Sequence, residues 1–224
     1  IESCVFLDDE TLAVFAKIGS VNFWNFRNNS MTKSKIYKSK VIQTEINGNS
    51  IWLTHENGIV ELINISSGKR INKFKADDSF LVDIAILPGA KKIITLGSGG
   101  RVRMWDLSSY ELIKEYIIPA RLISVKIDPM EEFCFILTNE SKVVTIELSS
   151  FSALKKQLKL KHSPLEFQYL DEQEELIYLD TDGALYRHSW KYENSLSAFN
   201  LRQLIFDCDN NKNERLINGM LALA

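Results

Sequence analysis

The chain has few cysteines and no long hydrophobic run. Only three cysteines, Cys4, Cys134 and Cys208, occur in 224 residues, and none lies close to another in the sequence. An odd number of scattered cysteines argues against a disulfide framework and is typical of a reducing compartment. No apolar stretch approaches the ~18 residues that a membrane-spanning helix needs, and no signal peptide opens the sequence. We therefore expect an intracellular protein of the cytoplasm or nucleus that has no membrane segment.

The sequence also lacks an excess of charge of either sign. Lysine and arginine number 27 against 29 aspartates and glutamates, which gives a formal net charge of −2. A field this weak gives the chain no general attraction to nucleic acid or to an anionic membrane. Hydrophobic residues make up 45% of the chain, which is ample for a buried core.

Recognisable catalytic motifs are missing. There is no Gly-x-Ser-x-Gly elbow, no Walker loop and no dinucleotide-binding fingerprint. The segment Gly97–Gly100 is glycine-rich, but it joins two predicted strands and no helix follows it, so we interpret it as a hairpin rather than a phosphate site. The three histidines, His55, His162 and His188, have no cysteine or histidine at metal-ligand spacing. We expect no catalytic residue, no bound metal and no cofactor, and the chain is not predicted to be an enzyme.

A repeat of about 40 residues runs along the chain. Its best-defined copy is Gly100–Leu107, which reads as a turn glycine, an alternating strand and then Trp-Asp. Four other segments align with this copy, at steps of 39 to 42 residues. The Trp position is held by Trp24, Ile63, Trp105, Ile146 and His188.

Each copy of the repeat predicts four strands. A turn residue lies five positions before each Trp position, and it is glycine in four of the five copies. Glycine suits a tight hairpin because it adopts positive φ without steric cost. Apolar segments flank this hairpin on both sides, and units of four strands at this period build propeller blades. The turn residues are Gly19, Gly58, Gly100, Ser141 and Gly183.

These features predict an all-β fold, namely a β-propeller of four-stranded antiparallel blades, about five and a half of which lie in this chain. One blade cannot bury both faces of its sheet, whereas stacked neighbours bury them for each other. We therefore interpret Trp24 and Trp105 as core residues and not as binding aromatics. The predicted blades span residues 1–40, 41–78, 79–119, 120–162 and 163–202, with a partial blade at 203–224.

The copy at Gly100–Leu107 resembles the WD40 repeat, and the resemblance covers the whole chain. The family's Gly-His dipeptide is absent from all five copies, and its hairpin aspartate occurs once, at Asp182. The family's His–Asp–Trp hydrogen-bond network cannot form as a set, so hydrophobic packing must replace it. The resemblance implies a propeller of seven or eight blades, of which this chain is a part. It also implies a non-catalytic scaffold subunit that binds other proteins within a larger intracellular complex.

The resemblance further implies where partners bind. In this family the usual contact surface is the rim formed by two kinds of loop, one between the second and third strands and one between the fourth strand and the next first strand. The candidate rim residues are Lys17, Lys40, His55, Glu56, Asp77, Ser98, Arg101, Arg121, Asn139, His162 and Asp182.

Two lysine-rich segments suggest an alternative function. Both fall on predicted fourth strands, which are the outer edges of their blades, and lysine there blocks pairing with the edges of other chains. A basic strip can also bind RNA, so the alternative is an RNA-associated subunit of a ribonucleoprotein or ribosome-assembly complex. The slightly negative net charge and the separation of the segments, which are three blades apart, favour edge protection instead. The lysines are Lys33, Lys35, Lys38 and Lys40 in the first segment, and Lys155, Lys156, Lys159 and Lys161 in the second.

A third hypothesis is a hydrolase with a metal ion in the central channel. The first strands, which line such a channel, offer Glu45, Asp83 and Glu166 but no histidine. We therefore prefer a binding protein to an enzyme.

Overall fold

The computed structural model describes residues 3–15, 20–36, 39–65, 69–155, 157–161, 164–170, 175–189 and 195–200. These residues form strands, turns and loops, with no helix among them, and so none that could cross a membrane. The chain divides into two compact units, residues 1–157 and 158–224.

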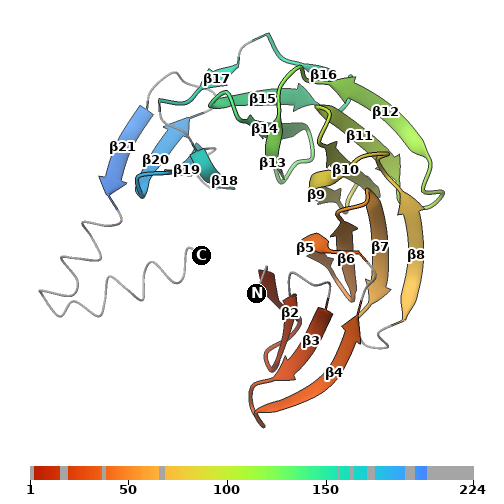
Figure 1. The fold of residues 1–224 in the computed structure, drawn as a ribbon. Helices are drawn as coiled ribbons and strands as arrows, with labels where there is room; N and C mark the ends of the chain where they lie inside the picture. The colour runs from red at the N-terminus through yellow and green to blue at the C-terminus, as the bar shows by residue number, and fades with distance from the viewer. Residues whose placement is uncertain are drawn as a thin grey trace, which may run out of the picture. The chain divides into compact units, whose positions relative to one another are not determined.

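The first unit holds four antiparallel sheets, which we call blades 1 to 4, each built from strands that are consecutive in the sequence (Figure 1). Blade 1 consists of β1 (Ser3–Phe6), β2 (Thr11–Phe15), β3 (Ser20–Asn25) and β4 (Ser30–Ile36). Blade 2 consists of β5 (Val41–Asn47), β6 (Ser50–His55), β7 (Ile59–Asn64) and β8 (Arg70–Lys75). Blade 3 consists of β9 (Leu81–Leu87), β10 (Lys92–Gly97), β11 (Arg101–Asp106) and β12 (Leu112–Ile117). Blade 4 consists of β13 (Leu122–Ile127), β14 (Phe133–Thr138), β15 (Lys142–Glu147) and β16 (Ser152–Ala153).

The second unit holds one further sheet, blade 5. It begins after the short strand β17 (Leu158–Lys159). Blade 5 consists of β18 (Pro164–Leu170), β19 (Glu175–Asp180), β20 (Ala184–Ser189) and β21 (Ser195–Asn200). The predicted all-β propeller fold of four-stranded antiparallel blades is thus confirmed for five blades. The predicted partial blade at 203–224 lies outside the described residues.

The fourth strand of blade 4 differs from the prediction. The apolar pattern predicts one strand over 154–160, whereas the structure has β16 at Ser152–Ala153 and, separately, β17 at Leu158–Lys159. Ladder pairing with β15 runs from Glu147↔Ser152 to Ile146↔Ala153, and Leu154 N then donates to Thr145 O at 2.8 Å. The regular ladder ends just before the exposed Lys155.

The turn residues between second and third strands behave as the repeat predicts. Gly58, Gly100, Ser141 and Gly183 all have positive φ, between 56° and 80°, and Gly19 lies outside the described residues. At Gly58 and Gly100 a Cβ atom would also overlap the backbone oxygens of Asp77 and Ile118, which follow the fourth strands of the same blades. Glycine at these two positions therefore lets each hairpin close against its own outer strand.

The core of the first unit lies between neighbouring blades. Successive side chains on a strand point to opposite faces, so each middle strand contributes to two cores. In blade 3, Ile93 and Trp105 pack toward blade 2, while Ile94 and Met104 pack toward blade 4. Trp105 is buried as predicted, and its Nε1 donates a hydrogen bond to Thr95 Oγ1 at 2.9 Å.

The inner strands add one polar link between blades. Asp83 on β9 is buried, and its carboxylate accepts a bond from Ile84 N at 2.8 Å and one from Val125 N of β13 at 2.9 Å. A buried carboxylate that is fully hydrogen-bonded holds two elements in one register. Cys134 of blade 4 lies in the core between blades 3 and 4, and burial raises the pKa of its thiol to about 12. The thiol therefore stays protonated and unreactive at neutral pH, which makes Cys134 a structural residue.

Blade 5 has its own buried residues. Phe167, Leu176 and Tyr178 are buried, and Tyr178 stacks on Tyr186 with ring centroids 4.8 Å apart. Arg187 donates to Glu175 Oε2 through Nε at 2.8 Å and Nη2 at 2.6 Å.

The inter-blade packing predicts that alanine substitution of two isoleucines of blade 3 lowers the free energy of unfolding by very different amounts. Ile94 is 0% exposed between blades 3 and 4, whereas Ile117 on the outer strand β12 is 59% exposed. We expect Ile94→Ala to lower the free energy of unfolding by about 3 kcal/mol and Ile117→Ala by less than about 1 kcal/mol, measured by urea denaturation. Equal losses at the two sites would contradict the assignment of the core to the space between blades.

Candidate partner-binding surfaces

Asp77 lies at the centre of the predicted rim, in the connection between β8 and β9. Its side chain is buried, with Ser79 N and Ser79 Oγ donating to Oδ1 at 2.9 and 2.6 Å. Arg103 Nη1 approaches Oδ2 at 2.9 Å, and Arg101 Nη1 lies 3.5 Å from Oδ1. Asp77 therefore supports the rim from within instead of presenting its charge to a partner.

Arg103 extends this network across blade 3. Its Nη1 also donates to Ala76 O at 2.7 Å, and its Nε donates to Glu115 Oε2 at 2.6 Å. The guanidinium thereby ties the connection leading out of blade 2 to both β11 and β12 of blade 3. Arg103 was not among the predicted rim residues, because in the sequence it reads as an ordinary alternating strand position.

Gly97, at the end of β10, makes room for this buried carboxylate. A Cβ atom at Gly97 would overlap Oδ2 of Asp77. The glycine-rich segment Gly97–Gly100 is thus a hairpin against which the Asp77 network packs, in agreement with its interpretation as a turn.

The same contacts set the ionisation of Asp77. Burial raises the pKa of its carboxyl, but the hydrogen bonds from Ser79 and the positive charges of Arg103 and Arg101 outweigh burial, so the pKa is lowered overall. Asp77 is charged at neutral pH and neutralises two arginines at the rim.

One backbone hydrogen bond recurs along the rim. In blades 2, 3 and 4, the backbone oxygen of the residue just before the first strand accepts a hydrogen bond from the hairpin between the second and third strands of the same blade. The three bonds are Glu56 N to Lys40 O at 2.9 Å, Ser98 N to Phe80 O at 3.0 Å and Asn139 N to Arg121 O at 2.9 Å. Lys40, Phe80 and Arg121 therefore occupy equivalent positions in blades 2, 3 and 4.

Phe80 is the residue that the sequence reading missed. Its ring is 49% exposed, and its backbone oxygen accepts a hydrogen bond from N of the partly exposed Ser98 at 3.0 Å. Its equivalence to Lys40 and Arg121, both predicted, was visible in the sequence as the position preceding each first strand. We call the described rim residues that share this side of blades 3 and 4 the rim surface: Phe80, Ser98, Arg101, Arg121 and Asn139.

The remaining predicted rim residues fall in different places. Glu56 is exposed next to Lys40, whereas His55 is 3% exposed, with Nδ1 3.3 Å from Ser39 O and Nε2 3.9 Å from Glu61 Oε2. His55 thus underlies the rim as Asp77 does. Asp182 is exposed in the second unit. Lys17 and His162 lie outside the described residues.

The two lysine segments are only partly described. Lys33 and Lys35 lie on β4, the outer strand of blade 1, as predicted. Lys155, Lys159 and Lys161 are exposed. Lys38 and Lys156 lie outside the described residues.

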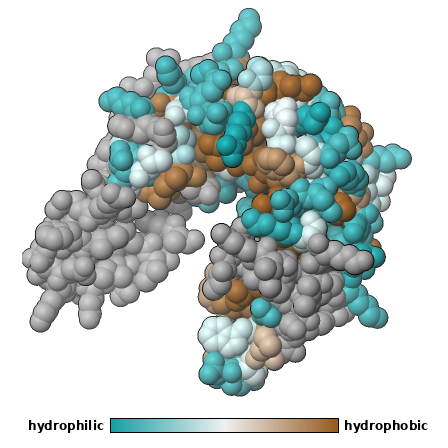
Figure 2. Space-filling view, viewed as in Figure 1, coloured by the Kyte–Doolittle hydropathy of each residue, from teal (hydrophilic) through white to brown (hydrophobic). Residues whose placement is uncertain are grey.

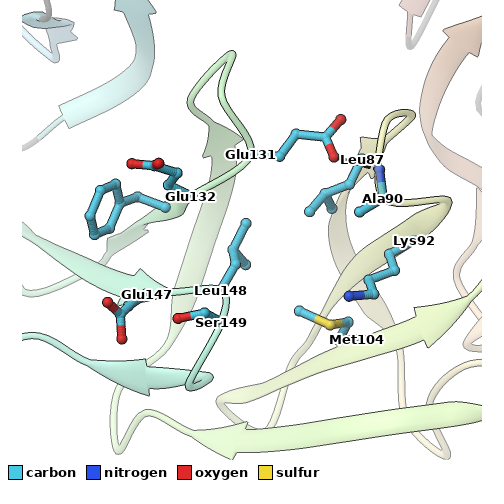
Figure 3. A pocket seen from close by; sticks show the side chains of 10 residues that line it. Leu87, Ala90, Lys92, Met104, Glu131, Glu132, Glu147, Leu148 and Ser149 are labelled. Carbon is cyan, nitrogen blue, oxygen red and sulfur yellow. Dashed lines mark hydrogen bonds between the residues drawn. The ribbon is translucent and has the colours of Figure 1, made fainter.

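A cleft of about 360 Å³ opens between blades 3 and 4, where the turns between first and second strands lie (Figure 3). Leu87, Met104 and Leu148 contribute apolar surface, and Lys92 and Glu147 enter from opposite sides. Glu131 closes one end, because its carboxylate accepts bonds from Gly89 N and Ala90 N at 2.8 and 2.7 Å. The cleft is therefore a hollow at the junction of two blades that Glu131 closes at one end.

Asp83 and Glu45, the first-strand carboxylates whose side chains the structure describes, belong to no metal site. Asp83 is engaged by two backbone amides, and burial raises the pKa of Glu45, with the charge of Lys126 opposing that rise. Among the described residues, no group of three or more potential ligands could hold a metal ion.

Comparison with known proteins finds a WD-repeat protein of low sequence identity and a solved structure of similar fold. No family model matches the chain. A stretch of 117 residues, 51% of this chain, is 22% identical to WD repeat-containing protein 36 from Homo sapiens and covers 13% of it. A chain in the solved structure titled "Crystal Structure of Mitotic Checkpoint Complex" matches with a TM-score of 0.76 at 12% identity, over 88% of this chain and 64% of that one. The chain resembles WD40-type β-propellers. It spans less than two thirds of the length of each of these two proteins.

The buried charge of Asp77 at this rim gives a pH-dependent prediction. Because the folded pKa of Asp77 is lowered, its stabilisation is complete above the unfolded value of about 3.9 and is lost as pH falls through the folded value. We expect Asp77→Asn to lower the free energy of unfolding by about 2 kcal/mol at pH 7, and the difference from wild type to narrow as pH falls below about 4.

The neighbouring Asp78 supplies a matched control because its side chain is exposed. Asp78→Asn should change stability by less than about 0.5 kcal/mol across the same pH range, measured by urea denaturation. A pH-independent effect of Asp77→Asn would show that its charge is not what stabilises the rim.

Proposed function

We propose that the chain is a non-catalytic scaffold subunit of a larger protein complex and that it binds a partner through the rim surface. The observation that carries the proposal is the exposed Phe80 ring, on a backbone whose carbonyl oxygen accepts a hydrogen bond from Ser98 N. Aromatic and arginine side chains dominate the binding energy of protein interfaces, and they do so best on a support that is ordered before binding.

The rim surface is continuous across two blades. The hairpin at Gly100 contacts the connection that leads to Arg121, since Ile118 N donates to Gly100 O at 2.9 Å. Arg121 N donates a hydrogen bond to Asn139 Oδ1 at 3.2 Å, and Arg121 O accepts one from Asn139 N at 2.9 Å. Both backbone polar groups of Arg121 are therefore held by Asn139. The rim surface thus offers an aromatic ring, two guanidinium groups and an amide.

The similar proteins support a binding role in general terms. The solved chain of matching fold comes from a structure titled as a complex, which is consistent with a propeller that is one subunit among several. We therefore propose, and do not take from those proteins, that this chain belongs to a complex and binds a partner.

The test combines two exposed rim substitutions, Phe80→Ala and Arg121→Ala, in the complete polypeptide. Neither change removes the backbone bonds that Phe80 and Arg121 make. We expect the double variant to reduce the recovery of co-purifying proteins by about tenfold or more, read by quantitative mass spectrometry, because hot-spot side chains contribute about 1–2 kcal/mol each.

The matched control is Lys91→Ala with Met130→Ala, two exposed residues in the turns between first and second strands of the same blades. This control should retain the partners. If it loses them as the rim variant does, or if the rim variant retains them, the rim surface is not the contact. Partners that disappear after nuclease treatment would instead support the RNA-associated alternative and make Lys155, Lys159 and Lys161 the residues to substitute.

A further inference from the structure

A small hollow opens in the rim between blades 3 and 4. Its volume is about 100 Å³. It adjoins the rim surface, because Ala120 directly precedes Arg121 and because Asn139 lies between two of the lining residues. We call this hollow the rim pocket, and its lining comes from residues 118–120 of the connection between β12 and β13, from Thr138, Glu140, Lys142 and Val144 of blade 4, and from Gln157.

The equivalent space between blades 2 and 3 holds the side chain of Arg103. Its Nη1 donates to Ala76 O at 2.7 Å and lies 2.9 Å from Asp77 Oδ2. Only 15% of the Arg103 side chain is exposed. An arginine and its carboxylate partner thus occupy the gap between β11 and the connection that leads out of blade 2.

Blade 4 has shorter, uncharged residues at the two equivalent positions. Val144 occupies in blade 4 the sheet position that Arg103 occupies in blade 3. Pro119 lies two residues after the outer strand β12, as Asp77 lies two residues after β8. A valine and a proline therefore stand where blades 2 and 3 have an ion pair, and the space that they leave is the rim pocket.

The polar groups at the edge of the rim pocket already have partners. Thr138 Oγ1 donates to Lys142 O at 3.1 Å, and Lys142 Nζ donates to Glu140 Oε2 at 2.7 Å. Ile118 O accepts a hydrogen bond from Ala120 N at 2.8 Å. Because these groups are satisfied within the chain, they give no advantage to a polar ligand atom over an apolar one.

The size and the wall of the rim pocket fit one aliphatic side chain. Ile118, Pro119, Ala120 and Val144 form an apolar wall. The volume is well below the ~300–1,000 Å³ of cofactor and small-molecule sites, and below the ~150 Å³ of a cavity that holds a benzene ring. On the face seen in Figure 2, hydrophilic and hydrophobic residues are mixed over blades 3 and 4, which suits a single apolar anchor better than a broad apolar contact.

The neighbouring Arg121 adds a charge to this site. Its side chain is exposed and forms no salt bridge with a carboxylate in the described part of the chain. Lys142, in contrast, is paired with Glu140. An exposed arginine beside an apolar pocket favours a partner that carries a carboxylate next to its apolar anchor.

We propose that the partner of the rim surface inserts one aliphatic side chain into the rim pocket and places an acidic residue against Arg121. This inference rests on the proposed function and adds the chemistry of the partner segment. The aliphatic side chain is that of leucine, isoleucine, valine or methionine, and it fills the space that Arg103 fills one blade earlier.

The first test fills the rim pocket from its own lining. Ala120→Leu adds a side chain to the pocket, whereas Ala120→Ser keeps it open, and both keep the backbone bond of residue 120. We expect Ala120→Leu to reduce the recovery of co-purifying proteins from the complete polypeptide by about tenfold and Ala120→Ser by less than about twofold. Gln157→Phe, a substitution at an exposed lining residue, should give the same loss without any change in the urea midpoint.

The outcomes separate this inference from the proposed function. If Phe80→Ala with Arg121→Ala loses the partners while Ala120→Leu and Gln157→Phe keep them, the rim surface is the contact but the pocket stays empty, and only the present proposal is overturned. If all of these variants keep the partners, both proposals fail.

The second test reads the charge of the partner segment. Arg121→Glu should bind about fivefold less than Arg121→Ala, because it repels a carboxylate instead of merely losing it. In the purified complex of Arg121→Lys, a water-soluble carbodiimide should join the new amine to an aspartate or glutamate of the partner, in a peptide that also contains an aliphatic residue. Equal binding of the glutamate and alanine variants, or a complex that gives no cross-link at position 121, would contradict the proposal.

Discussion

Apolar packing between neighbouring sheets is the interaction on which the rest of the structure depends. Each middle strand places alternate side chains on two faces, so Ile93 and Ile94 belong to different cores although they are adjacent in the chain. A lone blade would leave both sets in water. The hydrogen bond from Trp105 to Thr95 and the Asp83 bridge to Val125 are polar additions to a structure whose stability comes mainly from this burial.

The rim network follows from the same packing. Stacking blade 3 on blade 2 brings Arg103 over the connection that contains Asp77, and burial there makes an unpaired charge costly. The two arginines and Ser79 compensate that cost, while Gly97 leaves the space that the carboxylate fills. The result is a rim whose internal charges are paired and whose exposed groups, Phe80 and Arg121, stand on hydrogen-bonded backbone.

Much of the fold was predictable because the repeat constrains it at several levels at once. Spacing, turn glycines and alternation all indicated four-stranded units, and strands such as Leu81–Leu87 and Leu112–Ile117 appear as the pattern predicts. Individual roles within the rim were less predictable. Asp77 and His55 were chosen for their loop positions, yet burial depends on which side chains approach from the adjoining blade, and strand periodicity does not carry that information. Glu131 likewise reads as one member of an acidic turn, whereas the structure uses it to hold the backbone at Gly89 and Ala90.

The two exposed aromatics, Phe80 and Trp24, show why exposure must be read against the repeat. The equivalents of Phe80 are Lys40 and Arg121, polar residues at the same rim position, of which Arg121 is exposed and Lys40 is half-buried. An aromatic ring there adds binding surface to a place that the fold leaves open. The equivalents of Trp24 are buried, whereas Trp24 itself is 38% exposed among the described residues. The sequence interpretation of Trp24 as a core residue is therefore wrong for the described structure, because the repeat fixes the place of a side chain in its own sheet and not whether a neighbouring sheet covers it.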